Sequence, residues 1–72
     1  MKKINKVYNG YELENGKMYR LIDVGVNKYE MAEIVNLGLD DYRNYKEIPT
    51  GIIFSRVKDY KAYIKSLENG DK

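Results

Sequence analysis

The chain has 72 residues, with 13 Lys or Arg and 11 Asp or Glu, and its formal net charge of +2 is too small to indicate a nucleic-acid partner by itself. It contains no Cys and no His, which excludes disulfides, ordinary zinc sites and the Ser-His and Cys-His catalytic relays. We therefore expect one small domain, residues 1–72, that is not an enzyme and has no catalytic residues, cofactor or bound metal. Its stability should come from packing alone, or from packing together with self-association.

The N-terminal third of the chain predicts a β-hairpin. The dipeptide Asn15-Gly16 is typical of a type I′ turn, in which both central residues have positive φ. With this dipeptide at the tip, strands at about 6–14 and 17–25 collect most of their apolar side chains on one face, which favours this register. The apolar members of that face are Val7, Tyr11, Leu13, Met18, Ile22 and Val24.

The middle of the chain fits two structures. Residues 28–37 can form a third strand that continues the meander, or a helix that begins after Asn27 and ends at Gly38. Because a two-stranded hairpin alone is only marginally stable in water, we favour the strand and keep the helix as the alternative. Residues 39–46 are polar and are expected to form a loop.

The last third of the chain predicts a short strand followed by an amphipathic helix. The apolar run 52–54 follows the Pro and Gly of 49–51, which we expect to break the preceding structure. From Val57 onward, apolar residues recur at i, i+3, i+7 and i+10. This spacing predicts a helix at about 56–68, with Ser55 as its N-cap.

These elements predict an α+β fold, in which a small antiparallel meander of three or four strands is covered on one face by the C-terminal helix. The helix and the short strand should complete the core with Ile52, Phe54, Val57, Tyr60, Ile64 and Leu67. The ends of the chain, 1–4 and 69–72, are expected to fray. No apolar run follows the N-terminal lysines, and no stretch approaches the length of a membrane span, so we expect a cytoplasmic protein with no membrane partner.

Tyrosines outside this predicted core are the candidates for binding a protein. Tyrosine offers a large ring and a polar hydroxyl, and it is enriched at protein interfaces. The candidates are Tyr8, Tyr19, Tyr42 and Tyr45, together with the acidic pair Asp40 and Asp41. We therefore expect a small protein-binding regulator or inhibitor, such as the accessory proteins with which phages and mobile elements block a host enzyme or defence nuclease. Self-association as a homodimer stays open.

The predicted helix supports an alternative function, the binding of single-stranded nucleic acid. It carries a stripe of basic residues beside an aromatic one, namely Lys58, Lys61, Lys65 and Tyr63. Lysines attract phosphates, and exposed tyrosines of the helix and the sheet stack on unpaired bases. The alternative therefore combines the helix lysines with the sheet tyrosines.

The order of the predicted elements also resembles that of a family that binds single-stranded DNA. The run 51–55 between a meander and an aromatic-bearing helix resembles the single-stranded-DNA-binding transcriptional coactivator domains over about 17–67. That resemblance implies a basic sheet surface, whereas residues 29–48 of this chain are acidic, and the helix aromatic is displaced by one position. The sequence therefore assigns the chain to no family.

Overall fold

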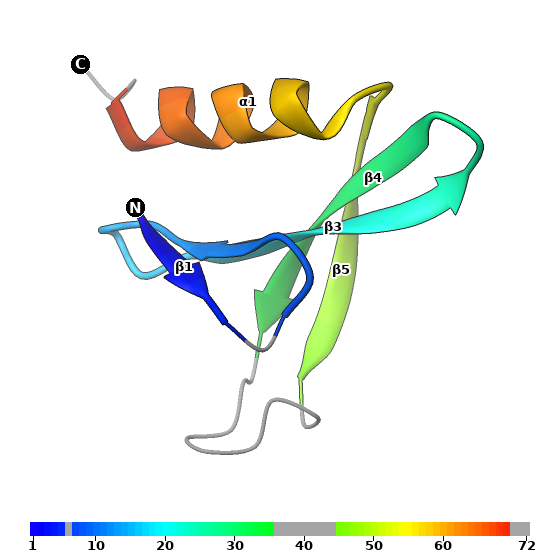
Figure 1. Cartoon of the computed structure of the whole chain (residues 1–72). Helices are drawn as coiled ribbons and strands as arrows, with labels where there is room; N and C mark the ends of the chain where they lie inside the picture. Colours follow the sequence, from blue (N-terminus) through cyan, green and yellow to red (C-terminus); the bar gives the residue numbers. More distant parts are fainter. Residues whose placement is uncertain (6, 36–44, 70–72) are drawn as a thin grey trace.

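The computed structural model describes residues 1–5, 7–35 and 45–69. They form an α+β fold of five strands and one helix (Figure 1). The elements are β1 (Lys2–Ile4), β2 (Gly10–Glu12), β3 (Met18–Gly25), β4 (Lys28–Val35), β5 (Lys46–Phe54) and α1 (Val57–Asn69). The predicted fold class and the C-terminal helix are confirmed, but the sheet has five strands instead of three or four. The additional strand is β1, which lies in the segment that was expected to fray.

The sheet is an antiparallel meander in the order β1-β2-β3-β4-β5. The strand interpretation of the middle segment is confirmed, because β4 pairs with both β3 and β5. Met31 and Ala32 are adjacent in β4 and point to opposite faces, and both are buried. A central strand that is buried on both faces lacks the simple alternation of a half-buried strand, which explains why its sequence also fitted a helix.

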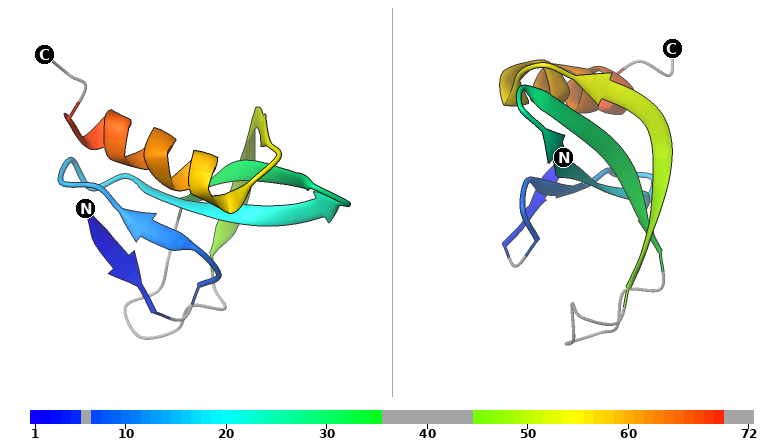
Figure 2. Two further views of the ribbon diagram at one scale, coloured as in Figure 1. Left: turned by 45° about the horizontal axis from the view of Figure 1, so that its top comes forward. Right: turned by 90° about the vertical axis from the view of Figure 1, so that its right-hand side faces the viewer.

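The main core lies between the sheet and α1, which packs along one face (Figure 2). Tyr60 and Ile64 of the helix are fully buried against residues of β2, β3, β4 and β5 and of the loop that joins β2 to β3. Their buried partners are Tyr11, Leu13, Leu21 and Met31. The Tyr60 hydroxyl donates a hydrogen bond to the Asn9 carbonyl (2.6 Å), and burial raises the pKa of this phenol far above its usual value. Tyr60 thus joins the helix to the turn between β1 and β2.

A second, smaller core lies on the opposite face of the sheet. It consists of Ile4, Val7 and Ile34, with Met18 and Tyr45 packed against them. The turn that follows β1 is stabilised by an internal hydrogen bond, in which the Gly10 N–H donates to the Val7 carbonyl (3.0 Å). β1 and this turn therefore cover apolar side chains that the helix cannot reach.

The predicted register of the first hairpin is wrong by one residue. Tyr11 pairs with Tyr19, and not with Arg20, because the connection contains three residues instead of two. The Leu13 N–H donates to the Lys17 carbonyl (2.8 Å), and the Leu13 carbonyl accepts from the N–H of Gly16 (2.9 Å). Gly16 has a φ of +92°, whereas Asn15 has no positive φ. These features define a type I turn followed by a glycine bulge, the usual three-residue hairpin loop.

The change of register exchanges the two faces of β3. Tyr19 and Leu21 now face α1, where Leu21 is fully buried. Met18 and Ile22, which were predicted to lie in the main core, occupy the opposite face and are only partly buried. Val24, also predicted to be buried, is exposed. A shift of one residue has this effect because successive side chains of a strand point to opposite faces.

β5 is longer than predicted, because Pro49 and Gly51 lie inside the strand and do not end it. Pro49 pairs with Ala32 and Ile53 pairs with Glu30, which leaves three β5 residues opposite Met31. This bulge is closed by a hydrogen bond from the Thr50 hydroxyl to the Met31 carbonyl (2.8 Å). β5 is the last strand of the sheet, and proline is tolerated at a sheet edge because its missing N–H is not required there.

The helix begins one residue later than predicted. The carbonyl of Arg56 accepts the first bond of the helix, from the N–H of Tyr60 (3.4 Å), so Arg56 and not Ser55 occupies the N-cap position. The Arg56 guanidinium donates two hydrogen bonds to the Asp59 carboxylate, at 3.0 and 3.1 Å. The acidic side chain in the first turn is favourable for the helix dipole.

Candidate binding surfaces

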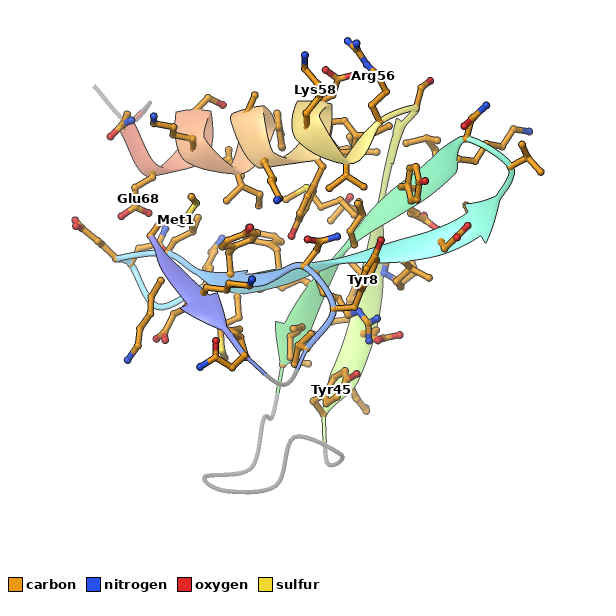
Figure 3. The ribbon with its side chains drawn as sticks, in the orientation of Figure 1. Met1, Tyr8, Tyr45, Arg56, Lys58 and Glu68 are labelled. Atoms are coloured by element: carbon orange, nitrogen blue, oxygen red, sulfur yellow. The ribbon has the colours of Figure 1, made fainter. Side chains whose placement is uncertain are left out.

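The structure separates the tyrosines that were predicted to bind a protein. Tyr8 is exposed in the turn between β1 and β2 (Figure 3). Tyr19 packs beneath α1, where burial, the carboxylate of Glu33 and the phenol of Tyr63 raise the pKa of its hydroxyl. Tyr45 is half-buried against the second core. The other predicted residues, Tyr42, Asp40 and Asp41, lie outside the described residues.

Tyr45 belongs to a polar bridge between β3 and β5. Nη1 of Arg20 donates to the Tyr45 hydroxyl (2.7 Å) and to Oε2 of Glu47 (2.6 Å). The bridge crosses over Ala32, the residue of β4 that pairs with Arg20. Nε of Arg20 is buried and has no hydrogen-bond partner in the described part of the chain. The carboxylate of Glu47 neutralises the positive charge of Arg20. We therefore interpret Arg20 as a structural link between β3 and β5.

Three of the exposed large hydrophobic residues lie at one end of the sheet. Val26, in the turn between β3 and β4, exposes 88% of its surface, and Val24 exposes 48%. Ile53 of β5 exposes 52% and is aligned across β4 with the partly buried Ile22. We call Val24, Val26 and Ile53 the hairpin-tip surface. In Figure 1 the tip of the β3–β4 hairpin projects past the first turn of α1.

Sequence reasoning missed this surface, although one signal for it was present. Val26 stands between Gly25 and Asn27 in a turn, where a side chain has no core to enter. An apolar residue at such a position is informative, because turns normally carry polar residues. Val24 gave no such signal, since the predicted hairpin register placed it in the core.

The first part of β5 is exposed on both faces and along its free edge. The six residues 46–51 are all exposed, and among the described residues their strand pairs with β4 on one side and with no strand on the other. Ile48 is the large apolar residue of this segment. An edge of this kind is a template for strand addition, but proline and bulges are the features with which proteins blunt such edges. Pro49 and the bulge after it divide this edge into two short pieces.

The basic residues predicted on the helix are placed as expected. The side chains of Lys58, Lys61 and Lys65 are all exposed on α1. Tyr63, in contrast, packs against Phe54, with the two ring centroids 5.7 Å apart. The lysines are therefore available to a partner, whereas Tyr63 is not available for stacking on a base.

Within the described ranges, no three His, Cys, Asp or Glu side chains come close enough to hold a metal ion. No helix among these residues has the length and apolar character needed to cross a membrane. Comparisons with protein-family models, with curated proteins and with solved structures find no match for this chain. The surfaces described above are therefore the basis on which a function is inferred.

Proposed function

We propose that this chain is a small, non-catalytic regulator or inhibitor that binds another protein through the hairpin-tip surface. The observation that carries the proposal is the grouping of Val24, Val26 and Ile53 at the projecting end of the sheet. Single apolar residues on a surface need no explanation, but a group of them at one place is typical of an interaction site. The described part of the chain holds six exposed large hydrophobics, and three of them form this group.

The hairpin that carries the surface is held in one conformation. β3 and β4 pair from Met18↔Ile34 to Gly25↔Lys28, with a bulge at Val24, and β4 is buried on both faces. The turn itself is shaped by Asn27, which has a φ of +54°, and by a hydrogen bond from the Gly25 N–H to the Asp23 carboxylate (3.2 Å). A tip that is ordered before binding loses little conformational entropy when the partner docks, which favours affinity.

The shape of the surface indicates a class of partner. A projecting hairpin with an apolar tip complements a concave apolar site, and clefts of this kind are the usual binding sites of enzymes. This supports the narrower proposal that the partner is an enzyme, such as a host enzyme or defence nuclease met by a phage or mobile element. Asp23, Lys28 and Glu30 surround the tip, so the rim of the partner's site should carry charges of both signs.

A single substitution tests the proposal after a tagged chain has captured its partner from a cell lysate. Val26→Asp places a charge at the centre of the proposed contact, and we expect the dissociation constant to rise at least about 30-fold, the effect of losing a binding hot spot of about 2 kcal/mol. Ala62→Asp adds the same charge on the exposed side of α1 and should change the constant by less than about threefold. Equal effects of the two changes, or no effect of either, would refute this surface.

A further inference from the structure

The exposed side of α1 carries positive charge that the helix itself does not neutralise. We call Lys58, Lys61 and Lys65 the lysine ridge; all three are exposed and lie along about 10 Å of helix. The two carboxylates of α1 have other partners. Asp59 binds the Arg56 guanidinium, as described above, and Glu68 accepts from the Met1 amino group (3.2 Å). None of the ion pairs among the described residues involves the ridge.

Helix stability does not account for this placement of the lysines. Cations stabilise the C-terminal end of a helix and destabilise its N-terminal end, because the helix dipole is positive at the N-terminus. Lys58 is the second residue of α1, whereas the last turn contains no basic residue and includes Glu68. Solubility requires exposed charge but favours neither one sign nor this end of the helix. The three exposed lysines are instead suited to binding an anionic partner.

Two further lysines lie near the C-terminal end of α1. The contact between Met1 and Glu68 places the start of β1 beside the last turn of α1 (Figure 3). The next residues of β1 are Lys2 and Lys3, and both are exposed. Because the acidic Glu68 lies at this junction, the ridge of α1 is treated as a site of its own.

We propose that the lysine ridge binds the phosphate backbone of a nucleic acid without reading its sequence. Each strand of a duplex rises by about 3.4 Å per phosphate along the duplex axis, so a ridge of about 10 Å aligned with that axis covers the rise of about three phosphates. Lysine acts on phosphate as a point charge, which needs no defined orientation. Because Tyr63 is packed against Phe54, the ridge offers no aromatic platform for bases, and the binding is electrostatic alone. This inference does not depend on the proposed protein partner.

Fluorescence anisotropy with labelled nucleic acids tests the inference. The probes are a duplex and a single strand of one sequence, titrated with the whole chain between about 50 and 200 mM salt. We expect binding with dissociation constants of about 10⁻⁴ to 10⁻⁶ M at physiological salt, and a slope of log affinity against log salt of about −2 to −3. Absence of binding to both probes at the lowest salt refutes the proposal. So does tighter binding of a labelled polyglutamate, which would assign the ridge to an acidic protein.

A matched pair of triple variants then locates the site. Replacing Lys58, Lys61 and Lys65 by Gln should weaken binding at least about tenfold at low salt and reduce the salt slope by about two. Replacing Lys17, Lys28 and Lys46 by Gln removes the same charge from exposed positions outside α1, and should change the affinity by less than about threefold. Both variants alter exposed residues only, and circular dichroism checks that they fold. Equal losses in the two variants would show general charge attraction in place of a site.

Discussion

The centre of the sheet and the beginning of β5 belong to one antiparallel sheet but are buried very differently. At the centre, Leu21 and Met31 lie beneath α1 and are almost completely buried. In β5, residues 46–49 pair with β4, residues 46–51 are exposed, and Ile52 and Phe54 further along the strand pack against the main core. The cause is the connection, since α1 starts directly after β5 and runs back over the centre of the sheet. Burial in this fold therefore follows the parts of the sheet that α1 covers on one face and that β1 and its turn cover on the other.

The strongest test of this comparison is a pair of substitutions, one in the helix that covers the centre of the sheet and one in β5. Ile64 is fully buried on the inner side of α1, and Ile64→Asp should cost about 3–5 kcal/mol, because it leaves a charge buried without a partner. Such a loss is a large part of the stability of a domain this small, so the variant should be mostly unfolded. Ile48→Asp, at an exposed position in the first part of β5, should cost less than about 1 kcal/mol. The contrast is measured by urea unfolding followed by circular dichroism, and similar losses in both variants would contradict it.

A second pair of substitutions tests which residues of β3 face the helix. Leu21→Ala should lower the free energy of unfolding by about 2–4 kcal/mol, because Leu21 is fully buried and a cavity would remain. Ile22→Ala, one residue further along, should cost about 1 kcal/mol, because Ile22 is only partly buried on the other face. With a two-residue turn at Asn15-Gly16 the order of these effects would be reversed. Thermal and urea unfolding of the two variants therefore distinguish the two registers directly.

The register shows where sequence reasoning about this fold succeeds and where it ends. The helix was predicted within one residue at each end, because the 3.6-residue repeat from Val57 is a local property. The turn was placed correctly at Gly16 but given the wrong type, since a glycine with positive φ suits both a two-residue and a three-residue loop. Those loops differ by one residue, and the choice between them depends on which face of β3 the helix covers. That is a long-range contact, which no local pattern contains.

The candidate surfaces, like the elements of the fold, include some that the sequence predicted and some that it did not. The lysine ridge follows from helical spacing alone and was predicted, because exposed polar residues fall opposite an apolar stripe. The hairpin-tip surface was missed, since the exposure of Val24 depends on the register, and Ile53 points away from the helix while its neighbours Ile52 and Phe54 pack against the main core. β1 was missed for a different reason, because a strand of three residues is too short to show an alternating pattern. Local surfaces were therefore predictable, and surfaces left open by tertiary packing were not.

The smallest expected effect on folding concerns the open edge of β5. Pro49 lies within this edge and offers no N–H, and the bulge that follows interrupts the ladder opposite Met31. Pro49→Thr supplies the missing donor and a residue that favours strands, so we expect the free energy of unfolding to change by less than about 1 kcal/mol. The edge, however, becomes a better template for another strand, and the variant should self-associate as its concentration rises. Analytical ultracentrifugation of the variant and the parent chain over a range of concentrations measures this. If their sedimentation is identical, Pro49 does not keep the edge unpaired, and the bulge at Gly51, with its φ of +83°, is sufficient.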